Sequence, residues 1–146
     1  MDQRFRETLA LIADGLSQFE TVFARELAGH AGLIGAMAEH ILASPGKRIR
    51  PAMYLLCSYV HGRDHDVPID AAVALELIHT ATLLHDDVND GADQRRGKPA
   101  ANRLWGNQAA VLMGDHLFAK AFRVMVENGD ARILHAISVA SERVAV

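Results

Sequence analysis

The chain has 146 residues, enough for one domain with a sizeable core, and 50% of them are hydrophobic. Its formal net charge of −3 does not fit a general nucleic-acid-binding protein, so no nucleic-acid partner is expected. No apolar run reaches the ~20 residues of a membrane span, and the charged N-terminus lacks the pattern of a secretory signal. The single cysteine, Cys57, excludes an internal disulfide, and we expect a buried thiol in a reducing, cytoplasmic setting.

Apolar residues recur at three-to-four spacing along most of the chain, which predicts an all-α fold without a convincing strand. The expected helices are 3–28, 33–43, 51–59, 71–90, a short piece at 99–105, 108–127 and one from 131 onward. Turn or loop signals separate several of them, at residues 44–46, 62–68 and 128–130. The last helix is still apolar and periodic at the final residue, and no internal repeat is present.

The helix expected at 71–90 is apolar almost all round, which places it in the centre of a bundle, with Asp70 as its N-cap. Its C-terminal end carries Asp86, Asp87 and Asp90. Like charges at this spacing destabilise a helix, and the partial negative charge of a helix C-terminus adds to the cost. A divalent cation such as Mg²⁺ would offset both penalties, because it prefers carboxylate oxygens. A solvated acidic helix end is the alternative for so short a pattern.

Two basic segments accompany the aspartates. Lys47, Arg48 and Arg50 cluster at a turn that enters a helix, and Arg95 and Arg96 follow the acidic end in a loop. A helix N-terminus favours anions, and arginine offers a phosphate two parallel donors. Either segment alone could be a solvated basic turn. Beside three carboxylates, the two segments indicate diphosphate chemistry.

The histidines give a weaker signal. His79 lies two turns before the acidic end and by spacing could face the same cavity, although a lone histidine on an apolar helix is more often a hydrogen-bonded core residue. We expect His85 to be structural, and its neighbours Asp86 and Asp87 make it a possible partner of a metal ligand. Asp115 fits a cavity or a surface position equally well.

Four segments, in this order, resemble the head-to-tail trans-isoprenyl diphosphate synthases, and most of all the long-chain, octaprenyl-type subgroup. They are GKRIRP at 46–51, LIHTATLLHDDVND at 77–90, RRGKPAAN at 95–102 and GNQAAVLMGDHLF at 106–118. The resemblance implies an isoprenoid-synthase helical bundle around a central cavity, usually in a homodimer. It also implies that residues 1–146 form the N-terminal part of a single synthase domain, because the family's second aspartate-rich motif is absent. The missing half or a complementary subunit would complete the cavity.

The family condenses isopentenyl diphosphate with an allylic diphosphate such as farnesyl diphosphate, and Mg²⁺ assists the release of pyrophosphate. By resemblance, Asp86, Asp87 and Asp90 are the catalytic, metal-binding residues on the allylic diphosphate, and Arg95 helps to bind that group. The residues that would bind isopentenyl diphosphate are Lys47, Arg50, His79 and Arg96.

Product length is argued from the residues one turn before Asp86. Bulky aromatic residues there stop elongation early in this family, whereas Ala81 and Thr82 are small and Ile78 lies deeper. We therefore expect a medium or long all-trans polyprenyl diphosphate, as used for quinone side chains.

Three alternatives remain: a class I terpene cyclase fragment, a non-catalytic small subunit of a full-length synthase, and an inactive helical scaffold. A cyclase needs no isopentenyl diphosphate site, so the basic turn and the arginine pair argue against it. The intact acidic and basic residues argue mildly against a non-catalytic subunit. Pro45 departs from the glycine usual in the family and is expected only to stiffen the turn.

Overall fold

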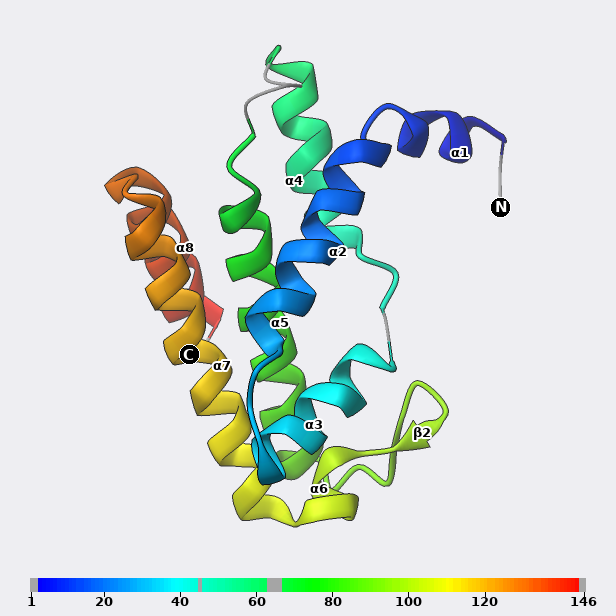
Figure 1. The fold of residues 1–146 in the computed structure, drawn as a ribbon, viewed down its shortest axis with the longest axis vertical. Coiled ribbons are helices and arrows are strands. Elements are labelled where there is room, and N and C mark those ends of the chain that lie inside the picture. The colour runs from blue at the N-terminus through cyan, green and yellow to red at the C-terminus, as the bar shows by residue number, and fades with distance from the viewer. Residues whose placement is uncertain (1–2, 45, 63–66, 145–146) are drawn as a thin grey trace.

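The computed structural model describes residues 3–44, 46–62 and 67–144. These residues form a helical bundle with one small hairpin (Figure 1), so the all-α prediction is confirmed. The elements are α1 (Gln3–Ala10), α2 (Ala13–Leu27), α3 (Gly32–Leu42), α4 (Ile49–Val60), α5 (Ile69–Asn89), β1 (Gln94–Arg95), β2 (Lys98–Pro99), α6 (Ala101–Trp105), α7 (Asn107–Asn128) and α8 (Ala131–Val144). No helix among them is long and apolar enough to cross a membrane.

Helix α5 forms the centre of the bundle, as its apolar circumference predicts. Val73, Leu77 and Ala81 are fully buried in one core cluster. Helix α7 runs back alongside α5, while α2 and α4 pack on α5 from other sides and α8 lies against α7 (Figure 1). The helix begins at Ile69, so Asp70 lies in its first turn and is not the N-cap that we expected.

The N-terminal helix is interrupted, which corrects the prediction of one helix over 3–28. The amides of Leu11 and Ile12 bond to carbonyls only three residues back, those of Thr8 and Leu9, at 3.3 and 3.2 Å. This tight turn buries Ile12, which is 5% exposed, and lets α1 leave the bundle (Figure 1). Three-to-four periodicity continues through such a turn, so the sequence pattern did not reveal it.

A two-stranded hairpin replaces part of the loop predicted after α5. Gln94 pairs with Pro99 and Arg95 with Lys98 in antiparallel register. The two turn residues, Arg96 and Gly97, both have positive φ, at 53° and 77°. That is the backbone of a type I′ turn, whose twist matches that of the flanking strands. Strands of two residues are too short to leave an alternating pattern in a sequence.

Helix α4 is more exposed than its apolar sequence suggests. Only Pro51 and Leu55 among its residues are buried. Cys57 is exposed, which corrects the expectation of a buried thiol, and it lies on the same helix as the exposed Met53 and Val60. Pro45, residues 63–66 of the expected polar loop and the end of the last predicted helix at 145–146 lie outside the described residues.

Candidate functional site

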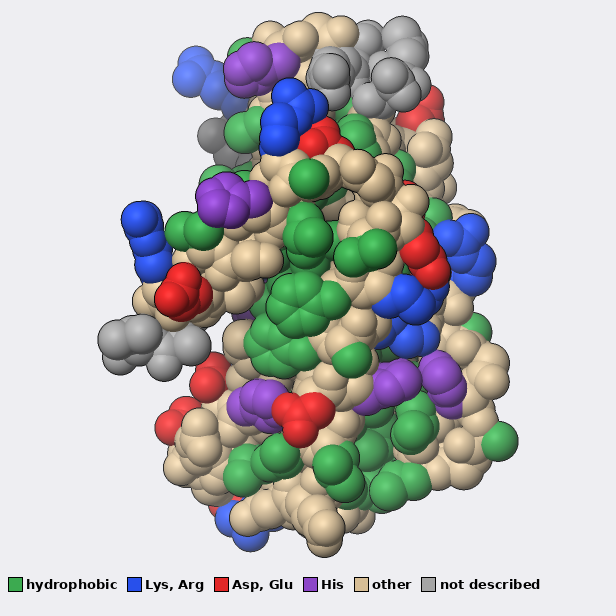
Figure 2. Space-filling model, turned by 90° about the vertical axis from the view of Figure 1, so that its left-hand side faces the viewer, with side chains coloured by type: hydrophobic (Ala, Val, Ile, Leu, Met, Phe, Trp, Pro, Cys, Tyr) green, Lys and Arg blue, Asp and Glu red, His purple; other side chains and the backbone are tan. Residues whose placement is uncertain are grey.

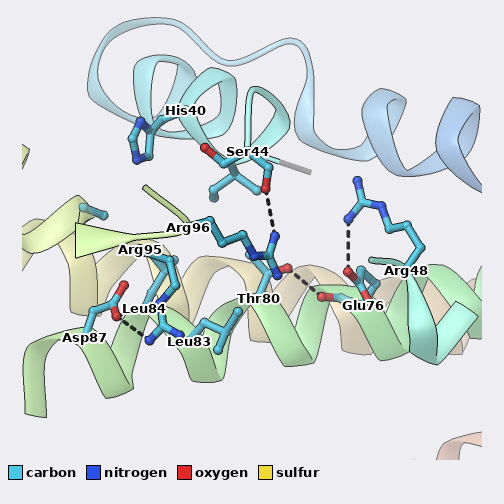
Figure 3. A pocket seen from close by; sticks show the side chains of 12 residues that line it. His40, Ser44, Arg48, Glu76, Thr80, Leu83, Leu84, Asp87, Arg95 and Arg96 are labelled. Atoms are coloured by element: carbon cyan, nitrogen blue, oxygen red, sulfur yellow. Dashed lines mark hydrogen bonds and ion pairs between the residues drawn. The ribbon is translucent and has the colours of Figure 1, made fainter. Parts of the chain in front are cut away.

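A cleft lies along α5, between that helix, the end of α3 and the β1–β2 hairpin (Figure 3). The cleft is partly open to solvent. Its charged lining comes from α5, the turn before α4 and the hairpin, with Glu76, Asp87, Arg48, Arg95 and Arg96. Segments far apart in the sequence thus bring acidic and basic groups to one place.

The three predicted metal ligands differ in their surroundings. Asp86 is exposed on α5, and Asp90, the C-cap residue of that helix, is exposed one turn later. The amide of Asp90 donates to the carbonyl of Asp86 at 2.8 Å, so the two residues lie one helical turn apart. Asp87 is only 2% exposed.

Asp87 is held inside by Arg95. The Nε and Nη2 atoms of Arg95 donate to Oδ1 of Asp87 at 2.9 and 2.5 Å. The carbonyl of Asp87 accepts bonds from the amide of Ala92 at 2.9 Å and from Nδ2 of Asn102 at 3.2 Å. Asn102 is buried and bridges to the carbonyl of Ala92 as well. Asn102 belongs to the RRGKPAAN segment, where the sequence alone did not indicate this bridging role.

Arg95 lies in the field of all three aspartates. Its hydrogen bond to Asp87 raises the pKa of Arg95 above the ordinary value, although burial opposes the rise. The charges of Asp87, Asp86 and Asp90 raise it further. Arg95 is therefore a permanent cation beside the acidic end of α5.

The carboxylates fit a magnesium ion only in part. Among the described residues, no three His, Cys, Asp or Glu side chains are arranged as a metal site. Asp86 and Asp90 nevertheless offer exposed carboxylate oxygens one turn apart. Protein-bound Mg²⁺ usually takes one or two carboxylates and completes its shell with waters and substrate phosphates. The donor set therefore fits a magnesium ion shared with a diphosphate, with Asp87 engaged by Arg95.

The two predicted basic segments meet. Nη1 of Arg96 donates to the carbonyl of Ser44 at 2.8 Å, and Nζ of Lys98 donates to the carbonyl of Ala43 at 2.6 Å. The guanidinium of Arg96 also lies against Gly46, where a Cβ would stand 2.6 Å from Nη2. The hairpin is thus fastened to the segment that leads into the GKRIRP turn.

Lys47 and Arg50 point away from such contacts. Both are exposed, and neither makes a hydrogen bond or an ion pair to another described residue. Arg48 between them differs, because its guanidinium binds Glu20 at 2.6 Å and Glu76 at 3.0 Å. Among the residues that the structure describes, only Arg48 of the three cations in this turn is neutralised by carboxylates, a distinction that the sequence did not reveal.

His79 lies in a positive environment on the half-buried face of α5. Burial lowers the pKa of His79 below its ordinary value, and the positive charge of Arg50 lowers it further. Glu76 raises it, while Arg96 and Arg95 also lower it. Arginines from the turn and from the hairpin therefore act on one imidazole, although His79 and Arg50 are not among the residues that line the cleft.

The three residues predicted to set product length lie on α5 before the aspartates. Ala81 is fully buried and belongs to the core cluster, and Ile78 packs against that cluster while partly exposed. Thr82 is half-buried, and its hydroxyl donates to the carbonyl of His79 at 2.8 Å. Thr82 therefore has more room around it than Ala81.

His85 links α5 to α7, which agrees with the structural role expected for it. Its Nε2 atom is 3.1 Å from the carbonyl of Val111 and 3.5 Å from Oδ1 of Asp115, and its ring stacks on Phe118. A Cβ on Gly114 would collide with the imidazole, so this glycine makes room for it. Asp115 is 62% exposed at its side chain, closer to the surface alternative than to a cavity.

Known proteins match this chain over the region that contains the four segments described above. Residues 32–146 match the family model described as polyprenyl synthetase. The chain is 38% identical to octaprenyl diphosphate synthase of Escherichia coli (strain K12) over 130 residues, which cover 89% of this chain and 40% of that enzyme. It is 35% identical to all-trans-nonaprenyl-diphosphate synthase (geranyl-diphosphate specific) of Rhodobacter capsulatus over 141 residues, which cover 96% and 43%.

Solved structures agree. A polyprenyl synthase from Caulobacter crescentus CB15, complexed with calcium and isoprenyl diphosphate, superposes with a TM-score of 0.86 at 38% identity, covering 94% of this chain and 42% of that one. A decaprenyl diphosphate synthase from Rhodobacter capsulatus gives a TM-score of 0.86 at 34% identity, covering 96% and 43%. The chain thus spans about two fifths of the length of the relatives it matches. The resemblance predicted from four segments is confirmed: the chain belongs to the polyprenyl synthetase family.

Proposed function

We propose that the chain is the N-terminal part of a single polyprenyl diphosphate synthase domain, a prenyltransferase that joins isopentenyl diphosphate to an allylic diphosphate. The observation that carries this proposal is the arrangement around α5. Free carboxylates and Arg95 occupy the end of that helix, while two basic segments, fastened together by Arg96, lie beside its middle. A class I terpene cyclase has one diphosphate to bind, so the second basic group favours a synthase.

The acidic end would hold the allylic diphosphate. Asp86 and Asp90 are the proposed magnesium ligands, with Asp87 as the third member of the motif and Arg95 donating to the same diphosphate. Bound magnesium supplies positive charge that stabilises the departing pyrophosphate. Arg95 is already placed and charged before the reaction, so it adds to that stabilisation without reorganising.

The basic side would hold isopentenyl diphosphate through Lys47, Arg50, His79 and Arg96. The exposed ammonium of Lys47 and guanidinium of Arg50 have no partner among the described side chains to displace. His79 becomes a better anion ligand when protonated, and a bound diphosphate would favour that form. These groups orient the alkene of isopentenyl diphosphate toward the allylic carbon.

The allylic carbon–oxygen bond breaks, and pyrophosphate leaves with the electron pair. The alkene of isopentenyl diphosphate attacks the resulting allylic cation and forms the new carbon–carbon bond. One proton then leaves the product, with the departing pyrophosphate as its acceptor. An apolar cavity protects the cation from water.

The product is proposed to be a medium or long all-trans polyprenyl diphosphate. Ala81, Thr82 and Ile78 carry this part of the proposal, because none is an aromatic residue that would block a growing tail. The similarity to octaprenyl and nonaprenyl diphosphate synthases supports it. The expected compartment is the cytoplasm.

Association with further protein is part of the proposal. Hydrophobic side chains gather in the middle of the face formed by α7 and α8 (Figure 2). On α7, Leu112 is 60% exposed, Phe122 41% and Val126 63%. Exposed apolar groups of this kind mark interaction surfaces. A homodimer, or the rest of a synthase fold, would cover them.

A subunit role is the second candidate. One relative, 40% identical over 129 residues, is named heptaprenyl diphosphate synthase component 2, from Geobacillus stearothermophilus. A chain of this family can therefore be one component of a synthase. Co-purification with a longer homologue would favour this candidate over a chain that acts alone.

The test is direct. The purified chain is incubated with Mg²⁺, farnesyl diphosphate and labelled isopentenyl diphosphate, and the products are sized. A ladder that ends at long polyprenyl chains supports the proposal. Loss of all product on chelation of the metal is the matched control. Failure to bind either diphosphate, in a chain that is folded, would refute it.

A further inference from the structure

Among the described residues, Arg48 is the cation of the GKRIRP turn whose side chain is bonded to carboxylates, and Figure 3 shows its bond to Glu76. Its Nε and Nη2 atoms donate to the two carboxylate oxygens of Glu20, at 2.6 and 3.1 Å. Its Nη1 atom donates to Oε1 of Glu76 at 3.0 Å. The guanidinium carbon lies 5.5 Å from the ring centre of Phe19 and 4.8 Å from that of Phe23.

These contacts tie three elements together. Glu20, Phe19 and Phe23 belong to α2, Glu76 belongs to α5, and Arg48 is the N-cap residue of α4. The Arg48 side chain is 14% exposed and that of Glu76 5%, so this pair is largely removed from water. We refer to Glu20, Arg48 and Glu76 as the Arg48 clamp.

The backbone of Arg48 is also unusual. It has φ 51° and ψ 35°, a left-handed conformation that residues with a side chain rarely adopt. Such a conformation persists where surrounding contacts over-determine it. The clamp is the contact set that does so here, and it fixes the direction in which the chain enters α4.

We propose that Arg48 is a positioning residue for the isopentenyl diphosphate site: the clamp holds the turn that carries Lys47 and Arg50, so that Arg50 acts on His79 and Lys47 stays exposed beside it in the turn. Arg48 itself is not a diphosphate ligand in this proposal, because two carboxylates already neutralise its charge and accept a hydrogen bond from each of its three nitrogens. This inference rests on the function proposed above. It assigns different roles to neighbouring cations that look alike in the sequence.

The pKa of Arg48 is consistent with this division. Burial alone would lower it, but hydrogen bonds and ion pairs with Glu20 and Glu76 raise it above the ordinary value. Lys47 lies next to it in the chain, yet is exposed and unpaired among the described residues. A proposed diphosphate ligand, Lys47, and a proposed positioning residue, Arg48, are thus neighbours in one turn.

The experiment compares four variants of the full chain. Arg48→Met with Glu76→Gln removes the clamp without leaving a buried unpaired charge. Lys47→Ala removes a proposed ligand only. Arg123→Met is the matched control, since Arg123 also pairs with a glutamate of α2, Glu26, at 2.5 Å. Glu20→Gln weakens the clamp at its exposed partner and serves if the double variant does not fold.

Two measurements separate positioning from binding. Amide hydrogen exchange of residues 46–52 should rise about tenfold in the clamp variants and stay unchanged in the Lys47 and Arg123 variants. Affinity for isopentenyl diphosphate, measured by calorimetry, should fall about tenfold or more in the clamp variants and in Lys47→Ala. Affinity for farnesyl diphosphate with Mg²⁺ should change little in either. Arg123→Met should leave both affinities unchanged.

The proposal is overturned if the clamp variants fold, bind isopentenyl diphosphate normally and keep slow exchange in residues 46–52. It is also overturned if affinity falls without faster exchange, because Arg48 would then be a ligand. If the unaltered chain binds no isopentenyl diphosphate while exchange rises as expected, the proposed function is wrong and the clamp remains supported by the exchange alone.

Discussion

At the scale of single residues, the three aspartates that look equivalent in the sequence have different partners. Asp87 is buried and bonded to Arg95 at 2.5 Å, whereas Asp86 and Asp90 are exposed. An exposed carboxylate is available to a metal without loss of a protein contact. A buried, paired one contributes to stability, because removing it leaves a cation without its partner.

Substitution should separate these roles. Asp86→Ala should weaken the binding of farnesyl diphosphate with Mg²⁺ by about tenfold or more and leave stability nearly unchanged. Asp87→Ala should lower the free energy of unfolding by about 1–3 kcal/mol, since Arg95 loses two hydrogen bonds but stays partly hydrated. Calorimetry and urea unfolding measure the two effects. Equal loss of stability in both variants would contradict the distinction.

His79 should make binding depend on pH. Its pKa is lowered by burial first and then by Arg50, so the folded chain holds fewer protons on His79 than the unfolded chain below the ordinary pKa of 6.5. Its effect on stability is therefore absent above that pKa and unfavourable as pH falls through it. Bound isopentenyl diphosphate should raise the pKa of His79, so binding should take up a proton at pH values close to the ordinary pKa of the imidazole.

Calorimetry in buffers of different ionisation enthalpy measures that uptake. His79→Gln is the control, because it keeps a polar side chain and removes the titrating group. Proton uptake that persists unchanged in His79→Gln would show that another group, such as the diphosphate itself, is responsible.

The kind of site could be predicted from the residue types in the sequence, but the partners of the individual side chains could not. Carboxylates at the end of an apolar helix and arginines after it already indicated a metal and a phosphate. Arg48, by contrast, is neutralised by Glu20 and Glu76, each 28 residues away in the sequence. Only the packing of α2 and α5 on either side of the turn brings them together, and one sequence without its fold gives no sign of it.

At the scale of elements, α5 and α7 are joined near the acidic end by a histidine seated on a glycine. The ring of His85 lies against Gly114 and bonds to the carbonyl of Val111 at 3.1 Å. Close packing of this kind tolerates little added volume. The position of the last turn of α5, and with it of Asp86, therefore depends on the surface of α7.

Gly114→Ala should destabilise the chain by about 1–3 kcal/mol, because the added methyl displaces His85. His85→Ala should cost less in a Gly114→Ala background than alone, since the displaced ring has already lost its place. A double-mutant cycle by urea unfolding measures the coupling. Additive effects would mean that the two residues do not share this contact.

The joint between the hairpin and the GKRIRP turn offers a second element-scale test. In Gly46→Ala, the new Cβ would stand 2.6 Å from Nη2 of Arg96, at the far end of a flexible side chain. Arg96 should move, so affinity for isopentenyl diphosphate should fall while stability changes by about 0.5 kcal/mol or less. Gly129→Ala, at φ 81° beyond α7, is the control and should cost about 1 kcal/mol without changing affinity.

Helices were predicted well where the three-to-four spacing of apolar residues runs uninterrupted. The central helix was expected at 71–90 and lies at Ile69–Asn89, and the long helix expected at 108–127 lies at Asn107–Asn128. The break after Ala10 was missed because a 3₁₀-like turn keeps the apolar spacing. The hairpin was missed because Arg96 adopts a positive φ that favours glycine, and nothing in its local sequence marks it.

At the scale of the whole molecule, α5 connects the acidic end to the opposite end of the bundle. Its residues from Ile69 to Asp86 span about 25 Å at the usual rise per residue. A product tail that starts at the aspartates and follows this helix passes Thr82 first. We propose that side-chain size there governs how far the tail extends.

Thr82→Phe should shorten the product ladder in the elongation assay, because a half-buried position can hold the ring in the path of the tail. Ala81→Phe is a poorer probe, since Ala81 is fully buried and the ring would overpack the core, at about 1–3 kcal/mol. Thr82→Ser keeps the hydroxyl and the small size and should leave the ladder unchanged. The same ladder from Thr82→Phe and from the unaltered chain would refute the cavity model.

The Arg48 clamp has a consequence for how small a working segment can be. The family match begins at residue 32, so α1 and α2 lie outside it, yet α2 supplies Glu20 and both aromatic rings beneath Arg48. A chain trimmed to the matched region would keep every proposed ligand of both diphosphates. It would lose α2, which helps to position Lys47 and Arg50 through the Arg48 clamp. A segment that contains every proposed ligand can therefore still be too short to hold those ligands in place.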